Sequence, residues 1–301
     1  MGVPPFVTRT LEAVDRFQRN NRVAGPAYAV TKKFSDDNAN LHVVALGWYG
    51  FTAIYPLLLV VITIFGFIGA ASLGTGVVHT LHEFPVIGSQ FNAAKGGESL
   101  HGSGIGLVIG LLTLVYGAQG VTQTAEQAME AVWDIPRIER PGFAVRLARS
   151  LGGLAIIGGA FLLNSVLASL ATARAESLAL RIGVIAALFV ANIALYTASF
   201  VVLTAAERGV RQYLPGAIVA AAGFTALITV GSSLVQHQLR HSSSTYGAFA
   251  AIIGVVLFLL LLAKLTMYAA ELNPVLAEKL WPRALFSSNP TEIDKRALRQ
   301  R

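Results

Sequence analysis

A long apolar run near the end of the chain constrains the fold more than any other feature. Residues 246–270 are apolar or small, with the exceptions of Lys264, Thr266 and Tyr268. About 20 such residues cross the ~30 Å hydrocarbon core of a bilayer as a helix, at ~1.5 Å per residue. Because a bilayer offers the backbone no water, the segment is predicted to be a helix that satisfies its own hydrogen bonds.

Five similar stretches precede this one, and together they predict an all-α integral membrane protein, a bundle of six transmembrane helices. Only 13% of the residues are charged, against roughly 25% in soluble domains, which agrees. One transmembrane domain is expected over residues 41–272, between a cytosolic amphipathic arm (1–40) and a basic cytosolic tail (273–301). The spans are expected at about residues 41–71, 101–121, 145–171, 178–203, 217–235 and 246–271.

The first 40 residues are predicted to form an arm with a short amphipathic helix. Val7, Leu11, Val14 and Phe17 recur every three or four residues and give that helix one apolar face. Such a helix can lie in the membrane interface, or it can pack on the cytosolic face of the protein. The arm shows no apolar core of a signal peptide, so none is expected to be cleaved.

Lysine and arginine are distributed unevenly between alternating loops. The arm, the second and fourth loops and the tail hold eighteen, whereas the opposite side holds four: Lys95, Arg174, Arg181 and Arg240. Cytosolic loops are enriched in these residues, so both termini are predicted to lie in the cytoplasm. The net charge of +7 then reflects topology and attraction to anionic headgroups. We expect membrane lipids as partners, and no nucleic acid.

A polar stripe continues from the second span into the cytosolic loop. Its members follow one another at helical spacings of four, three and four residues: Gln119, Gln123, Glu126 and Glu130. One interpretation is a solvated helix face that emerges from the bilayer. The other is the wall of a polar cavity.

The last span carries a second polar stripe, Lys264, Tyr268 and Glu271. A charge at mid-helix depth costs roughly 2.5–3.5 kcal/mol on insertion scales, so it usually faces protein or a wet cavity. The stripe can therefore form the cytosolic mouth of a pathway, or Lys264 can extend to the inner headgroups. Asn164 and Asn192, in the third and fourth spans, favour interhelical hydrogen bonds over ligand contacts.

Small residues and proline mark where spans pack or bend. Gly102, Gly106 and Gly110 sit four apart, the spacing that lets membrane helices approach closely. No strand precedes them and the G-x-G-x-x-G spacing is not met, so a nucleotide site is disfavoured. Pro56 is expected to kink the first span, because proline removes a backbone hydrogen bond.

Metal and cofactor sites have little support in the sequence. Five of the six histidines fall on the predicted outer side: His79, His82, His101, His237 and His241. Pairs such as His79 and His82 could bind zinc or sense acid pH. No complete ligand set accompanies them, and there is no cysteine. We expect no metal, no cofactor and no catalytic residue.

Several segments are shared with a known family: KKFSDD before the first span, YGFTAIYPLLLV within it, MEAVWDIPR after the second and YLPGAIVAAAGF at the fifth. The most specific is the last span, which closes on AELNP. On these segments the chain resembles the YihY/BrkB family of bacterial inner-membrane proteins over nearly its whole length. The resemblance implies six helices in the bacterial inner (plasma) membrane, and it carries an older ribonuclease label.

Two classes of function fit these features. The first is a transporter or flippase-like protein for a lipid, lipid-linked or amphiphilic solute, working through a polar cavity open to the cytosolic side. The second is a non-catalytic scaffold or homo-oligomer that maintains envelope integrity. A nuclease would need clustered carboxylates for metal ions, and the acidic pairs here have a membrane-edge explanation. The chain is therefore expected not to be an enzyme.

Overall fold

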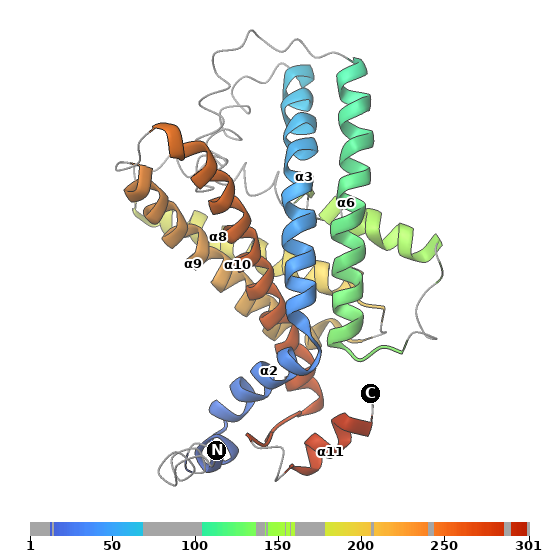
Figure 1. Ribbon diagram of the computed structural model, residues 1–301, viewed down its shortest axis with the longest axis vertical. Coiled ribbons are helices and arrows are strands. Elements are labelled where there is room, and N and C mark those ends of the chain that lie inside the picture. The colour runs from blue at the N-terminus through green and yellow to red at the C-terminus, as the bar shows by residue number, and fades with distance from the viewer. Residues whose placement is uncertain are drawn as a thin grey trace.

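The computed structural model is helical throughout the regular structure that it describes (Figure 1). It describes residues 13, 15–68, 104–136, 142, 144–153, 155, 156, 158, 159, 178–205, 208–239, 244–285 and 290–299. Among them there is no strand. The expected all-α class is therefore confirmed.

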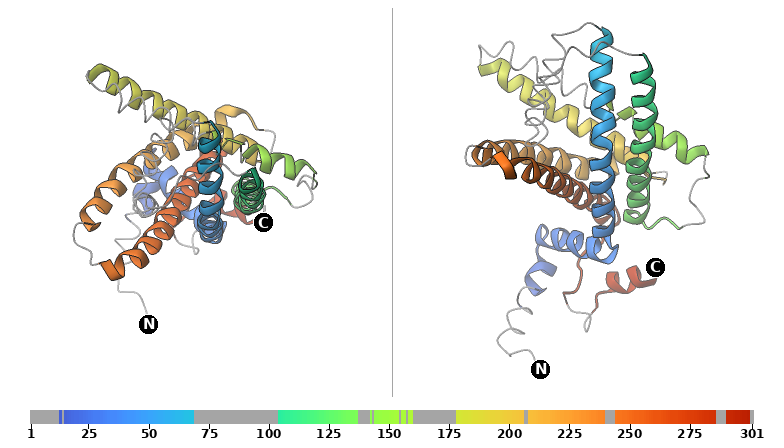
Figure 2. Two further views of the ribbon diagram at one scale, coloured as in Figure 1. Left: turned by 90° about the horizontal axis from the view of Figure 1, so that it is seen from above. Right: turned by 45° about the horizontal axis from the view of Figure 1, so that its top comes forward.

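Five long helices form the body of the described structure. They are α3 (Ala39–Ile68), α6 (Gly104–Val132), α8 (Leu178–Leu203), α9 (Leu214–Leu239) and α10 (Ser244–Glu278). In Figures 1 and 2, α3 and α6 stand side by side, while α10 leans across α3 and packs along α9. A 3-10 turn, Val210–Gln212, joins α8 to α9.

These helices coincide with five of the expected spans, and helical residues at 144–153 mark the start of the remaining one, the third, expected at 145–171. Two of them are long and apolar enough to cross a membrane over their described residues, at Ile185–Leu203 and Ile253–Glu278. A shorter apolar stretch covers Leu214–Ile228. The number of crossings remains a prediction.

Helix α6 extends eleven residues past the expected end of its span at 121, because its polar continuation stays helical to Val132. Helix α3 stays helical through Pro56, whose side chain lies outside the described residues. Gly106 and Gly110 lie in α6, and Gly102 lies outside the described part of the chain.

Close approaches between helices are visible at other glycines. A Cβ at Gly120 of α6 would overlap the ring of Tyr49 on α3. A Cβ at Gly216 of α9 would meet the backbone oxygen of Ala269 on α10. Helix packing through small residues is thus present, at positions where the side-chain-free backbone lets the neighbouring helix come closer.

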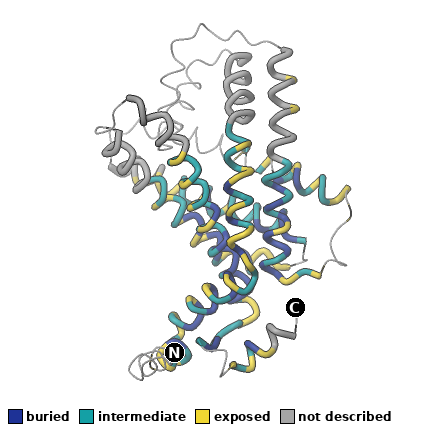
Figure 3. The backbone as a smooth tube through the Cα atoms, in the orientation of Figure 1, coloured by how far each residue is buried: buried dark blue, intermediate teal, exposed yellow. Residues whose placement is uncertain are grey.

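Two short helices lie at one end of the bundle. Helix α2 (Ala24–Asp36) crosses beneath α3 and packs on α10, and α11 (Glu292–Arg299) lies at the same end near the C-terminus (Figures 1 and 2). Buried residues gather where α2 meets the lower parts of α3, α6 and α10 (Figure 3). The protein therefore has its most buried described region at this end.

Candidate functional site

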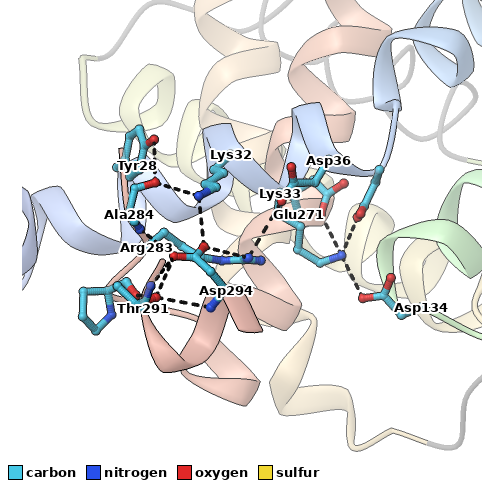
Figure 4. A network of polar contacts seen from close by, with 12 residues as sticks. Tyr28, Lys32, Lys33, Asp36, Asp134, Glu271, Arg283, Ala284, Thr291 and Asp294 are labelled. Atoms are coloured by element: carbon cyan, nitrogen blue, oxygen red, sulfur yellow. Dashed lines mark hydrogen bonds and ion pairs between the residues drawn. The ribbon is translucent and has the colours of Figure 1, made fainter. Parts of the chain in front are cut away.

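A buried lysine joins three helices at this end of the protein. Lys33 of α2 pairs with Asp37, with Asp134 at 3.1 Å and with Glu271 at 3.7 Å (Figure 4). The side chains of Lys33, Asp37 and Glu271 are at most 5% exposed, whereas that of Asp134 is 41% exposed. We call these four residues the Lys33 cluster. They tie α2 to the end of α6 and to α10.

Local backbone structure brings the acids to the lysine. Asp37 follows α2 directly and lies one helical turn after Lys33. Asp134 follows α6 with a positive φ of 50°, and the next amide, of Ile135, bonds back to Glu130 at 2.9 Å. This is the left-handed turn that commonly ends a helix. It aims Asp134 at Lys33 (Figure 4).

The charge of Lys33 is set by two opposing effects. Burial lowers the pKa of Lys33, but the carboxyl groups of Glu271, Asp37 and Asp134 together outweigh it. The pKa of Lys33 therefore lies above its ordinary value. The lysine stays protonated across the physiological range.

A second polar cluster joins the N-terminal arm to the C-terminal tail. Asp294 of α11 accepts hydrogen bonds from the amides of Ala284 and Thr291, at 2.8 and 2.9 Å, and pairs with Lys32 and Arg283 at 3.0 and 3.3 Å (Figure 4). We call these five residues the tail lock.

Further contacts outside the tail lock join the arm to the tail. Asp15 accepts from the amide of Leu285 at 3.0 Å, and Gln18 donates to the carbonyl of Arg283 at 2.6 Å. Asp15 and Gln18 thus bond the arm to the tail. The two interpretations of the amphipathic helix remain predictions, because Val7, Leu11 and Val14 lie outside the described residues and Phe17 is 63% exposed.

Two buried acids lie along α6, one turn apart. Glu126 and Glu130 are 2% and 1% exposed. Ser150 donates to Glu126 at 3.2 Å, and Arg146 lies 3.7 Å from the same carboxyl group. Gln119 and Gln123 are half-buried further along the helix. The end of the stripe therefore faces protein, which argues against the solvated-face interpretation.

The three polar residues expected on one face of α10 have separate surroundings. Glu271 is fully buried in the Lys33 cluster. Tyr268 stacks on Phe34 of α2, with ring centroids 4.1 Å apart. Lys264 is exposed, which fits the interpretation that it extends toward the headgroups. The structure therefore brings Tyr268 and Glu271 together at the α2 contact and leaves Lys264 out.

Of the two asparagines expected to form hydrogen bonds between helices, only Asn192 lies in the described part of the chain. Asn192 of α8 is buried and has a polar interaction. Asn164 lies outside the described residues. Arg208, shortly after α8, pairs with Glu278 at 3.0 Å and lies over the Trp133 ring, 5.0 Å from its centroid.

Sequence reasoning missed Lys33, Asn273 and Asp294. Lys33 was counted only as a topology charge, although it lies in the shared KKFSDD segment. Asn273 of α10 accepts a hydrogen bond from the amide of Gly216 at 2.8 Å and so caps the start of α9. Both polar residues of the AELNP segment thus contact another helix. Glu271 pairs with Lys33 of α2, and Asn273 bonds to Gly216 of α9.

A sequence model of the virulence factor BrkB family matches residues 30–292. The chain belongs to this family. The matched region contains the whole Lys33 cluster, Asn273 and both buried acids of α6. No curated protein and no solved structure matches the chain. Family membership and the two apolar helices support a membrane protein.

Proposed function

We propose that this BrkB-family protein is a non-enzymatic transporter or flippase-like protein of the bacterial inner membrane. Its cargo would be a lipid, lipid-linked or amphiphilic solute that enters at the cytosolic end of the bundle. The observation that carries the proposal is the burial of Glu126 and Glu130 on a helix that continues into an expected span. Ionisable groups inside membrane bundles are expensive and commonly mark pathways for ions or substrates.

The surroundings of Glu126 favour a ligand with hydrogen-bond donors. One of its carboxyl oxygens accepts no hydrogen bond, and Arg146 lies 3.7 Å away. The half-buried Gln119 and Gln123 continue the polar face along the same helix. An ammonium or hydroxyl headgroup is the chemistry that such acceptors bind.

Reconstituted vesicles provide the test. We expect purified protein to accelerate transfer of a fluorescent phosphatidylethanolamine between leaflets, measured by quenching of the outer leaflet. Glu126→Gln is expected to reduce the rate about tenfold or more, the effect of ~1.4 kcal/mol. Glu292→Gln, at an exposed acid of α11, is the matched control and should transfer at the wild-type rate.

An envelope scaffold is the second candidate, and one observation favours it. Helix α8 exposes Ile182, Ile185 and Val190, a face that a second subunit can cover as well as lipid can. If wild-type vesicles transfer no faster than protein-free ones, while the protein crosslinks to itself through cysteines placed on this face, the scaffold replaces the transporter. A monomer that transfers lipid leaves the transporter proposal in place.

A further inference from the structure

The Lys33 cluster contains more acid than base. Three carboxyl groups, on Asp37, Asp134 and Glu271, surround the one ammonium group of Lys33. The nearest other charged groups of α2 and the tail, Asp36 and Arg283, pair with each other at 3.8 Å and add no net charge. If every carboxyl group were ionised, the cluster would carry a net charge of −2. Only Asp134 is exposed, at 41%, so at least one excess negative charge would lie on the buried pair of Asp37 and Glu271.

Glu271 shows how the excess is relieved. Its side chain is fully buried, and neither of its carboxyl oxygens accepts a hydrogen bond from an N–H or hydroxyl donor. The Nζ of Lys33 is 3.7 Å away, beyond hydrogen-bond length. Asp37 pairs with the same Nζ of Lys33 as Glu271, so the two carboxyl groups are neighbours around one ammonium group. Two carboxyl groups can bond to each other only when one of them carries a proton.

We propose that Asp37 and Glu271 share one proton, and that they form a proton-binding site at the junction of α2 and α10. The proton supplies the hydrogen bond that Glu271 otherwise lacks, and it reduces the excess negative charge of the cluster. Lys33 keeps its own proton and holds the pair between α2 and the end of α6. This proton-binding site does not depend on the proposed function, because its geometry is the same in a transporter and in a scaffold.

Release of this proton has a mechanical consequence. Two adjacent carboxylates repel each other strongly in a site that excludes water. Asp37 directly follows α2, whereas Glu271 lies on α10, so the repulsion acts across the contact between the two helices. That contact also includes an apolar cluster of Ala29, Val30 and Val275, with Leu272 packed against it, and the stack of Phe34 on Tyr268. Rising pH should therefore loosen α2 from α10.

Infrared spectroscopy of the full chain in nanodiscs tests for the proton. At neutral pH we expect a carbonyl stretch from a protonated carboxyl group, which disappears on alkalinisation. Glu271→Gln and Asp37→Asn should each abolish this band, while Glu292→Gln, at an exposed acid, should leave it unchanged. A wild-type spectrum without the band, as a bridging cation would give, overturns the proposal, as does a band that survives both substitutions.

Spin-label distances test the consequence and do not depend on assigning the band. The chain has no cysteine, so labels at Thr31→Cys and Ala277→Cys, both exposed, report only on α2 and α10. Their distance distribution should broaden at alkaline pH in the otherwise wild-type protein. With Glu271→Gln, which holds the pair at one negative charge and removes the carboxylate–carboxylate repulsion, it should stay narrow at every pH. Equal broadening in both proteins contradicts the proposal.

Discussion

Lys33 is the residue through which the arm, α6 and α10 are held at one point. Its side chain is 2% exposed, and its ammonium group contacts carboxyl groups from three segments of the chain. A buried charge network of this kind is costly to assemble, but removing one partner is costlier, because it leaves the other charges unpaired in a dry site. Replacing Lys33 therefore tests how much the protein depends on this network.

Lys33→Met should destabilise the protein by about 3–5 kcal/mol, the range found when one partner of a buried pair is lost. The methionine fills similar space but leaves Asp37 and Glu271 without their counter-charge. Thermal unfolding in detergent, followed by loss of helical circular dichroism, measures the effect. Lys295→Met removes an exposed pair with Glu292 and should leave the unfolding temperature unchanged. Equal stability of the Lys33 variant and wild type would contradict this account.

At this scale the sequence placed Tyr268 and Glu271 on one helix face but did not predict what they contact. Spacing placed Tyr268 and Glu271 on one face of a helix, and both lie at the contact with α2. The partner of Glu271 could not be found from spacing, because Lys33 lies far away along the chain. Lys264 was the stronger candidate by hydropathy alone. A lysine in an apolar run gives the same hydropathy pattern whether it is exposed or buried. Its burial depends on the neighbouring helices, which hydropathy does not describe.

The contact between α9 and α10 depends on a small residue at the start of α9. A Cβ at Gly216 would meet the backbone oxygen of Ala269, which cannot move without shifting α10. The amide of Gly216 is also the donor to Asn273. We expect Gly216→Ala to cost about 1–3 kcal/mol, as overpacking does.

The matched control for Gly216→Ala is Gly209→Ala. Gly209 has no atom within 4 Å of a Cβ added there, and its φ of −65° suits alanine. Unfolding curves of the two variants in detergent should separate clearly, with Gly209→Ala at the wild-type midpoint. Coincident curves would show that α9 can retreat from α10 at little cost.

The tail lock makes the position of α11 sensitive to acid. Burial raises the pKa of Asp294, but hydrogen bonds from Ala284, Thr291 and Lys32 outweigh it, and the pKa lies well below its ordinary value. The stabilisation is therefore complete above about pH 4, the ordinary range of an aspartate, and is lost as the pH falls toward the folded pKa. Spin labels at Thr31→Cys and Glu292→Cys should show α11 leaving α2 on acidification.

Asp294→Asn provides the comparison for that experiment. The amide keeps the size of the side chain but cannot pair as an anion with Lys32, so α11 should already be displaced at neutral pH. Its label distances should then change little with pH. A variant that releases α11 at the same low pH as wild type would assign the acid sensitivity to another group.

The sequence predicted the positions of the helices better than the residues at which they end. The apolar runs gave helices at the expected positions of α3, α8, α9 and α10, because a membrane helix is specified by length and hydropathy. The end of α6 was predicted too early. Its continuation is polar by composition, yet it stays helical because Ala128, Met129 and Val132 are buried in the core. Hydropathy measures solvent preference and could not anticipate that packing.

For the whole molecule, the contacts between arm and tail bear on the predicted topology. Asp15 and Lys32 bond to Leu285 and Asp294, and a membrane chain whose two ends bond to each other crosses the bilayer an even number of times. The predicted six crossings satisfy this condition. The excess of lysine and arginine in the arm and tail predicts that both ends lie in the cytoplasm.

Cysteine labelling in intact spheroplasts and in inverted vesicles measures this topology directly, because the native chain contains no cysteine. Ser35→Cys and Glu292→Cys, both exposed, should react with a membrane-impermeant maleimide only in inverted vesicles. Lys95→Cys, in the first outer loop by charge count, should react only in spheroplasts. Because the arm and tail are bonded to each other, opposite labelling of Ser35→Cys and Glu292→Cys is forbidden. Observing it would overturn both the even number of crossings and the contacts from which it comes.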